Sequence, residues 1–191
     1  MVMVSAVDAS GNESTCMFNI IVNPAPEICN GLDDDCDGFV DEADDAWRQI
    51  DKNLVSNGQT GDLYGASVAL YGSNAVVGAK NADGNGANSG LAYVLQNDDS
   101  NPDDWYQVAV LNTSDVEAED LFGASVGIFT NLIVVGAPQD DDLSVNAGAA
   151  YIFAKNTTSN TWSLVKKITA ADGFANDNFG TAVSIHGDKI L

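Results

Sequence analysis

Short apolar segments alternate with turn residues over most of the chain. In one stretch the apolar segments lie at 66–70, 74–79, 91–95 and 106–111, and each is only five or six residues long. Gly, Asn, Asp and Ser gather between them. Segments of this length bounded by such residues are typical of β-strands, whereas a helix needs a longer run with apolar residues three and four apart. The pattern therefore predicts an all-β protein.

The same set of segments occurs again further along the chain. An aromatic residue followed by glycine marks each copy, and a tryptophan precedes each aromatic residue by 17 positions. Successive copies lie 58 and 57 residues apart. Four strands recurring at such a period, with glycine and alanine where strands crowd, predict the blades of a β-propeller. The landmarks are Trp47 with Tyr64-Gly65, Trp105 with Phe122-Gly123, and Trp162 with Phe179-Gly180.

Each copy is expected to contribute four strands in a fixed order. One strand follows the tryptophan, one follows the aromatic-glycine pair, one is an apolar run ending in Gly-Ala, and one follows a later glycine. We group these four strands into one blade, so the chain holds about two and a half blades. Two blades and a part cannot close a ring and would leave unpaired strand edges, so we expect further blades of the same chain. In the second copy the strands are expected at 106–111, 124–128, 132–137 and 149–153, and the strand after the third tryptophan is expected at 163–168.

A different organisation precedes the repeats. Residues 1–6 and 15–22 alternate between apolar and polar positions around a turn at 8–12, which predicts a β-hairpin. Pro24 and Pro26 follow and stiffen the chain, because each proline fixes its own φ and extends the residue before it. We therefore expect three parts, residues 1–23, 24–46 and 47–191.

The middle part has the spacing of a calcium loop. Carboxylates stand at loop positions 1, 3 and 5, glycine follows at position 6, and a main-chain carbonyl at 7 and acids at 9 and 12 complete the set. Alternate side chains of a chain that curls around an ion converge on it, so the spacing predicts a Ca²⁺ site. The last acid is Asp instead of the longer Glu, which predicts weak affinity. The predicted ligands are Asp33, Asp35, Asp37, the carbonyl of Phe39, Asp41 and Asp44.

Two cysteines bracket the first acids of this loop. A disulfide between Cys29 and Cys36 would close an eight-residue ring and stabilise the loop by roughly 2 to 3 kcal/mol on a chain-entropy estimate. The same thiols are also candidate ligands for a softer metal, although two thiolates without a nearby histidine make a poor zinc site. The alternative for the whole segment is a solvated acidic linker closed by a disulfide.

Three resemblances follow from these patterns. The string E-x-C-N-G-x-D-D-D-C-D-G-x-V-D-E at 27–42 is similar to the metal-binding motif of MopE-type secreted proteins, and also to thrombospondin type 3 calcium loops. The strings D-L-Y-G-A-S-V-A with V-V-G-A-K, and D-L-F-G-A-S-V-G with V-V-G-A-P, resemble FG-GAP repeats, the blades of integrin α-subunit heads. Residues 4–22 resemble the closing strands of an immunoglobulin-like hyalin repeat (HYR) domain, in which Cys16 matches a cysteine that pairs with an earlier one. The alternative for Cys16 is a free buried thiol on a strand.

The FG-GAP resemblance implies a propeller, but its calcium sites do not carry over. Calcium-binding integrin blades hold the ion in the hairpin between the first two strands, and the corresponding turns at 71–74, 129–131 and 186–188 are too short to wrap one. The acidic loops at 81–85 and 140–142 follow the second strand instead. We expect them to be solvated loops, with a cation site as the alternative.

The amino-acid composition limits the classes of binding partner and the cellular location that we expect. Seven basic against 28 acidic residues give a net charge of −21, which argues against nucleic acid or an anionic membrane as partner. No apolar run approaches the roughly 18 residues that span a bilayer. Closely spaced cysteines favour an oxidising compartment. We therefore expect an extracellular protein, secreted or attached to the cell surface, and an internal fragment of a larger one.

No catalytic constellation is recognisable. His186 is the only histidine and stands at a predicted hairpin tip, so no serine-histidine-acid set forms around it. The expected function is therefore non-catalytic adhesion or recognition of an extracellular protein or glycan, with a calcium-binding loop between domains. The alternatives are an accessory propeller of a larger secreted hydrolytic enzyme and a spacer in a surface stalk.

Overall fold

The computed structural model describes residues 2–7, 13–18, 55, 57–98 and 101–191. The chain divides into two compact units, Met1–Gln49 and Ile50–Leu191. Every regular element in the described residues is a β-strand, which confirms the predicted all-β class. The predicted boundaries at 23 and 46 fall outside the described residues. Among those residues, no helix with the length and apolar character of a membrane span is present.

The first unit contains the predicted hairpin. Strand β1 (Val2–Val7) pairs antiparallel with β2 (Glu13–Phe18), and Val4 lies opposite Cys16. Strand β2 begins two residues earlier than the sequence pattern indicated. The remainder of the predicted second strand lies outside the described residues, so its length stays a prediction.

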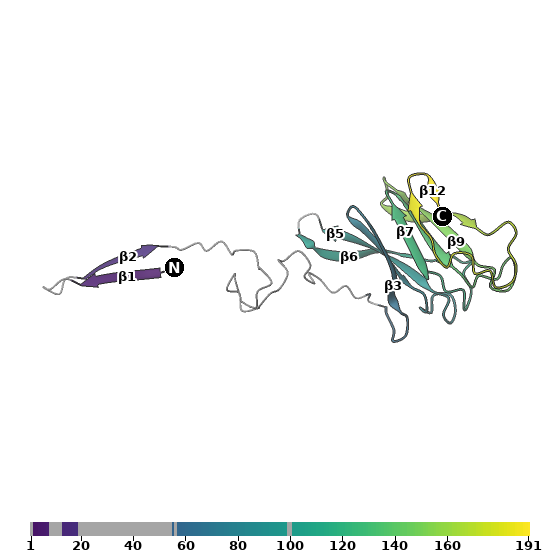
Figure 1. Cartoon of the computed structure of the whole chain (residues 1–191), viewed down its shortest axis with the longest axis horizontal. Helices are drawn as coiled ribbons and strands as arrows, with labels where there is room; N and C mark the ends of the chain where they lie inside the picture. The colour runs from purple at the N-terminus through teal and green to yellow at the C-terminus, as the bar shows by residue number, and fades with distance from the viewer. Residues whose placement is uncertain (1, 8–12, 19–54, 56, 99–100) are drawn as a thin grey trace, which may run out of the picture. The chain divides into compact units, whose positions relative to one another are not determined.

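The second unit is built from four-stranded sheets that we call blades (Figure 1). Each of the two complete blades is an antiparallel meander in which strands adjacent in sequence are adjacent in the sheet. Two short strands begin a third blade and form a hairpin. The first blade comprises β3 (Tyr64–Tyr71), β4 (Asn74–Ala79), β5 (Leu91–Asp98) and β6 (Asn101–Leu111). The second comprises β7 (Ser125–Phe129), β8 (Leu132–Ala137), β9 (Ala149–Asn156) and β10 (Thr161–Ile168). The third begins with β11 (Ile185–His186) and β12 (Lys189–Ile190).

The predicted strands are present, but their grouping into blades was wrong. The strand that carries a tryptophan is the outer strand of the blade begun by the preceding aromatic-glycine pair: β6 holds Trp105 and pairs with β5. Trp162 lies in the same way on β10, and both indole rings are half-buried. Trp47 lies outside the described residues. Each sequence copy therefore supplies the outer strand of one blade and the first three strands of the next.

The innermost strands bring neighbouring blades together. Strand β7 packs against β3 and β4 of the first blade, and β11 packs against β7. Aromatic rings at the tips of the inner hairpins follow one another, with centroids 4.9 Å apart from Tyr71 to Phe129 and 4.8 Å apart from Phe129 to His186. His186 therefore stands at a hairpin tip, as predicted. Blades arranged side by side around their first strands give the fold of a partial propeller.

One apolar core lies between the first and second blades. Val76 and Val94 of the first blade belong to the same buried cluster as Ile133 and Val135 of the second. Phe122 is fully buried in it, with its ring centroid 5.4 Å from that of Tyr151. Burying such side chains stabilises the pair of blades by about 1.5–3 kcal/mol each.

A repeated joint fixes each blade to the next. The Ser67 hydroxyl donates to the Gly123 carbonyl at 2.8 Å, and one blade later Ser125 donates to the Gly180 carbonyl at 2.7 Å. Glycine is required opposite each carbonyl, because a Cβ on Gly78 would lie 2.0 Å from the Gly123 oxygen. The Phe-Gly and Gly-Ala elements of the repeat meet at this joint, which explains why both recur at fixed spacing.

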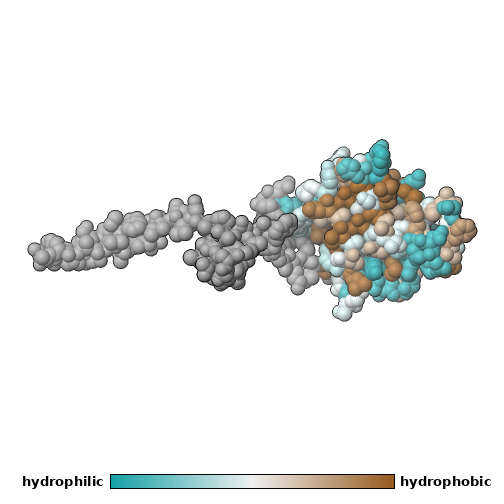
Figure 2. Space-filling view, in the orientation of Figure 1, coloured by the Kyte–Doolittle hydropathy of each residue, from teal (hydrophilic) through white to brown (hydrophobic). Residues whose placement is uncertain are grey.

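The first blade leaves one apolar face uncovered. Val68 and Leu70 of β3 are 69% and 65% exposed, whereas the equivalent Val126 and Ile128 of β7 are 8% and 6% exposed because they face the first blade. Figure 2 shows apolar side chains gathered over the sheet of β3 to β6. This face has the character of an interface between blades.

Candidate metal centre

The predicted calcium loop lies outside the described residues. The geometry and the contacts of its predicted ligands are therefore not described. These ligands and the Cys29–Cys36 disulfide both stay predictions. The six residues concerned are Asp33, Asp35, Asp37, Phe39, Asp41 and Asp44.

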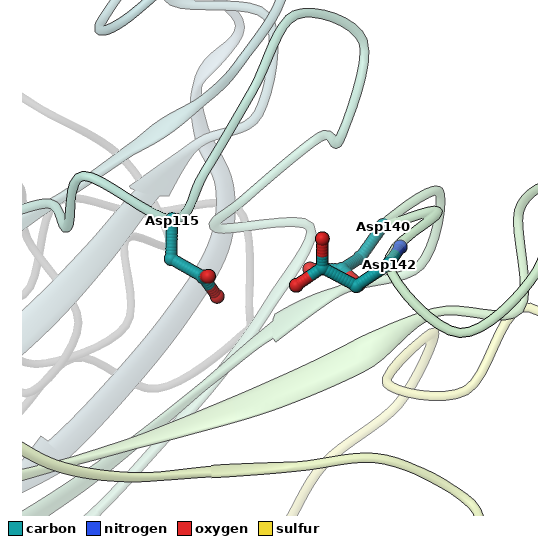
Figure 3. A group of neighbouring side chains, drawn as sticks. All are labelled: Asp115, Asp140 and Asp142. Carbon is teal, nitrogen blue, oxygen red and sulfur yellow. Dashed lines mark hydrogen bonds between the residues drawn. The ribbon is translucent and has the colours of Figure 1, made fainter.

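A second acidic group is described in full. Asp115, Asp140 and Asp142 point their carboxylates toward a common centre (Figure 3), and one oxygen from each lies within 4.8 Å of the others. Asp115 comes from the loop after β6, and the other two come from the loop after β8. Carboxylate oxygens gathered at this distance are the ligands that Ca²⁺ and Mg²⁺ prefer.

Backbone hydrogen bonds hold the two loops in place. The Asp140 amide donates to the Ala137 carbonyl at 3.3 Å, and the Gly148 amide closes the loop by donating to the Asp140 carbonyl at 2.9 Å. The Val116 amide donates to the Thr113 carbonyl at 3.1 Å, which forms the turn that presents Asp115. The acids are therefore positioned by loop structure that follows directly from the strand ends.

The ammonium group of Lys167 occupies the centre of this group. Its Nζ lies 2.8 Å from Asp115 Oδ2 and 2.7 Å from Asp140 Oδ2, and it also pairs with Asp142. The Tyr151 hydroxyl oxygen lies 2.6 Å from Asp140 Oδ2 and 2.9 Å from Asp115 Oδ2, so its single proton is shared between the two carboxylates. An ammonium and a divalent ion would compete for the same oxygens, so the lysine has the place that a metal would take.

The pKa values follow from this arrangement. Burial alone would lower the pKa of Lys167, but its hydrogen bonds to the three carboxylates outweigh burial and raise the pKa above the ordinary value. The hydrogen bond from Lys167 lowers the pKa of Asp115. Burial, followed by the hydrogen bond to Asp140, raises the pKa of Tyr151. At neutral pH the centre thus holds a charged lysine and a neutral tyrosine.

The first blade lacks this charge network at the equivalent place. There Tyr93 donates its hydroxyl to Asn57 at 3.3 Å, as Tyr151 does to Asp115. Val110 stands at the position of Lys167 in strand register, opposite Tyr93 as Lys167 is opposite Tyr151. In the first blade, Ala82 and Gly84 stand at the positions of Asp140 and Asp142. The charged centre is therefore specific to the second blade.

The expectation of a solvated loop at 140–142 was wrong for its first residue. Asp140 is only 1% exposed, because Lys167 and Tyr151 compensate its charge and let it pack inside. Asp141 is exposed, as expected. Sequence reasoning missed Asp115 and Lys167. One sequence signal could have indicated this charged group: a lysine in a strand where the other copy has valine.

A further buried acid lies beside this centre. Asp120 is 3% exposed and accepts a hydrogen bond from the Glu117 amide at 2.8 Å. Asp62 and Asp177 cap the same turn in the other copies, each accepting from the amide three residues before it. Burial, aided by the charges of Asp140 and Asp141, raises the pKa of Asp120 to about 6.

Two family profiles match the chain. The profile described as FG-GAP repeat matches residues 47–95, 105–153 and 162–191, more than half of the 191 residues. The profile described as "Putative metal-binding motif", of the MopE type, matches residues 21–42, which include the first predicted ligands. No curated protein matches the chain with significant similarity.

Proposed function

Because this chain belongs to the FG-GAP repeat family, we propose that it is a non-catalytic recognition module of an extracellular protein, secreted or attached to the cell surface. The observation that carries the proposal is a scaffold of hydrogen-bonded blades whose polar loops after β4 and β6 are bonded to each other. Loops on such scaffolds are the usual place for binding residues. The ligand is proposed to be an extracellular protein or a glycan.

Contacts between loops support this role. Asn85, in the loop between β4 and β5, donates its side-chain amide to the carbonyls of Thr113 and Val116 in the loop between β6 and β7, at 2.7 and 2.9 Å. Asn112 donates back to Asn85 at 2.9 Å. A surface depression of about 480 Å³ lies here, lined by Asn85, Val116 and Glu117 among others. Loops ordered before binding lose less entropy when a ligand arrives.

A binding array tests the recognition role. We expect the purified chain to bind a member of a panel of glycans and extracellular matrix proteins, and Asn85→Ala to weaken that binding because the loops lose their mutual support. The control is Asn156→Ala, at the exposed last residue of β9, whose side chain accepts hydrogen bonds from the Thr158 and Ser159 amides of the adjoining turn. Binding that is equally weak for both variants, or hydrolysis of a panel member, would contradict the proposal.

We further propose that the loop at 33–44 is a calcium site between domains. Its support is the ligand spacing together with the match to a metal-binding family at 21–42. The profile carries the name Cu-binding_MopE, so copper is the competing ion. Carboxylates suit Ca²⁺, whereas Cu(I) prefers thiolates such as those of Cys29 and Cys36.

Titration separates the two metals and the two acidic groups. We expect calorimetric titration of the full chain with Ca²⁺ to release heat that Asp33→Asn combined with Asp35→Asn removes and Asp142→Asn leaves unchanged. If the heat were lost only with Asp142→Asn, the Ca²⁺ site would be assigned to the second blade instead. Binding of copper but not calcium, abolished by Cys29→Ser, would refute the calcium assignment.

The hairpin β1–β2 is proposed to be the end of an immunoglobulin-like HYR domain. The support is its antiparallel pairing together with the sequence pattern that places Cys16 on the second strand. The prediction is that Cys16 is oxidised in the secreted full-length protein. Mass spectrometry after alkylation without reduction checks it, and a freely alkylated Cys16 would contradict it.

A further inference from the structure

Three asparagines of the chain stand in the pattern Asn-x-Ser/Thr, the acceptor sequence for N-linked glycans: Asn12, Asn112 and Asn156. Asn12 lies outside the described residues. We propose that Asn156 is a glycosylation site and that Asn112 is not, because the fold leaves the side-chain nitrogen of Asn156 accessible and covers that of Asn112. This inference rests on the extracellular location proposed above.

Asn156 ends β9 and begins an exposed turn. Residues 156–160 are all exposed. The Asn156 Oδ1 accepts hydrogen bonds from the amides of Thr158 at 2.9 Å and Ser159 at 3.1 Å. In the described part of the chain its Nδ2 donates no hydrogen bond. The turn therefore holds the side chain by its oxygen and leaves the nitrogen free to react.

Asn112 is held by the opposite atom. Its Nδ2 donates to Asn85 Oδ1 at 2.9 Å, and a Cβ on Gly84 would lie only 3.2 Å from the same nitrogen. Asn112 and Thr113 are half-buried. The loop after β4 therefore covers the nitrogen that would have to form the new bond. A bulky glycan at this place would separate the two loops that border the surface depression.

The order of the strands places Asn156 far from those loops. Strand β9 begins at the loop after β8 and ends at Asn156. The loop after β8 meets the loop after β6, because the Tyr151 hydroxyl contacts both Asp140 and Asp115. The depression thus lies at one end of the sheets and Asn156 at the other. A glycan on Asn156 leaves the proposed recognition loops uncovered.

The modification requires an oligosaccharide carried on a lipid diphosphate and the transferase that uses it. The Asn156 Nδ2 forms a bond to the anomeric carbon of the first sugar, while the bond from that carbon to the diphosphate oxygen breaks. The diphosphate leaves with the electron pair, and the amide gives up one proton to a base of the transferase. The acceptor pattern also requires a hydroxyl two residues after the asparagine, and the exposed Thr158 supplies it.

Expression of the full chain in the secretory pathway of a eukaryotic cell tests the assignment. The chain is recovered from both the medium and the cells, and peptide mass spectra are compared before and after treatment with peptide-N-glycosidase. This enzyme converts a glycosylated asparagine to aspartate and so marks its position. We expect a glycan on Asn156 and none on Asn112. An unmodified Asn156, or a glycan on Asn112, would overturn the proposal.

Two matched threonine substitutions locate the glycan. Thr158→Val removes the hydroxyl that the acceptor pattern requires, whereas Thr157→Val changes the intervening position and keeps the pattern. Both side chains are exposed, so neither change should disturb the fold. We expect Thr158→Val to lose the glycan on Asn156 and Thr157→Val to retain it. A glycan that persists in Thr158→Val, or that is lost equally from both variants, would contradict the site.

The panel of glycans and matrix proteins separates this inference from the proposed function. We expect the glycosylated chain and Thr158→Val to bind equally well, because the glycan lies at the other end of the sheets. Weaker binding by the glycosylated chain would contradict that placement. A chain that carries the glycan on Asn156 but binds no panel member would refute the recognition role alone, whereas a chain that binds but stays unmodified would overturn only the glycosylation site.

Discussion

Lys167 compensates the negative charge of three acids in the second blade, which would otherwise repel one another. Its ammonium contacts Asp115, Asp140 and Asp142. Asp140 is almost fully buried and depends most on this compensation. Removing one partner from a buried ion pair costs more than the pair contributes, because the other charge remains without water.

We predict that Lys167→Met lowers the free energy of unfolding by about 3 kcal/mol. Methionine keeps the side-chain length but leaves the carboxylates without a cation. Addition of Ca²⁺ should restore part of the lost stability in this variant, because the ion can enter the vacated centre. Urea unfolding followed by tryptophan fluorescence measures both effects.

The control for this prediction is Lys189→Met. Lys189 pairs with Asp188, but their side chains are 82% and 89% exposed, so little change is expected. If Lys167→Met were as stable as Lys189→Met, or gained nothing from calcium, Lys167 would not be the resident cation of the centre.

Asp120 makes stability depend on pH in an unusual direction. Its pKa is about 6 in the folded protein against an ordinary value of 3.8, so the folded state binds the proton more tightly than the unfolded state. The contribution of Asp120 to stability therefore falls as pH rises from about 4 to about 6, and its cost is fully present above that range.

We predict that Asp120→Asn is more stable than the parent at pH 7 and that this gain disappears near pH 4. Asparagine keeps an oxygen to accept the hydrogen bond from the Glu117 amide and removes the charge. Urea midpoints at pH 4, 5, 6 and 7 give the comparison. Asp172→Asn, at an exposed acid, controls for the loss of one negative charge. A gain that is the same at all four values of pH would refute the assignment.

At the scale of the elements, the joint between blades depends on glycine. In the second blade a Cβ on Gly136 would lie 1.9 Å from the Gly180 oxygen and 2.3 Å from the Ser125 hydroxyl. Neither neighbour can move far, because one is backbone and the other is hydrogen-bonded to it. The blades would have to separate.

We predict that Gly136→Ala destabilises the propeller by at least about 3 kcal/mol. Ser125→Ala at the same joint removes only one hydrogen bond and should cost about 1 kcal/mol. Gly187→Ala is the control, because its Cβ would meet nothing within 4 Å and only its φ of +62° is unfavourable. Thermal unfolding of the three variants ranks them, and a Gly136→Ala that is no worse than Gly187→Ala would show that the joint can open.

The elements were largely predictable, and the charged centre was not. Spacing alone located β4 and β8, because an apolar run ending in Gly-Ala is a local pattern. The assignment of β6 to its blade failed because pairing between strands is not local. Lys167 and Asp115 are 52 residues apart, and only the fold brings them together. No period in the sequence indicates such a contact.

At the scale of the whole molecule, the two faces of the first blade differ in the substitutions that they tolerate. One face is buried against the second blade, while Val68 and Leu70 lie on the uncovered one. We predict that Leu70→Lys leaves the free energy of unfolding nearly unchanged and reduces self-association. Ile128→Lys, at the equivalent position of β7, should unfold the protein because it buries a charge between blades.

Urea unfolding and analytical ultracentrifugation of the two variants provide the test. Comparable destabilisation by both substitutions would mean that the face bearing Leu70 is already covered in solution.

The offset between sequence copy and blade affects how such a protein can change in length. Every 57- or 58-residue period begins by completing a sheet that the previous period started and ends inside a sheet of its own, so a duplication or deletion of one period rejoins a sheet at matching strands wherever the breakpoints fall. Genetic recombination between copies would then preserve strand pairing at the junction. A ring organised in this way can gain or lose a segment in a single event while every remaining strand keeps its neighbour.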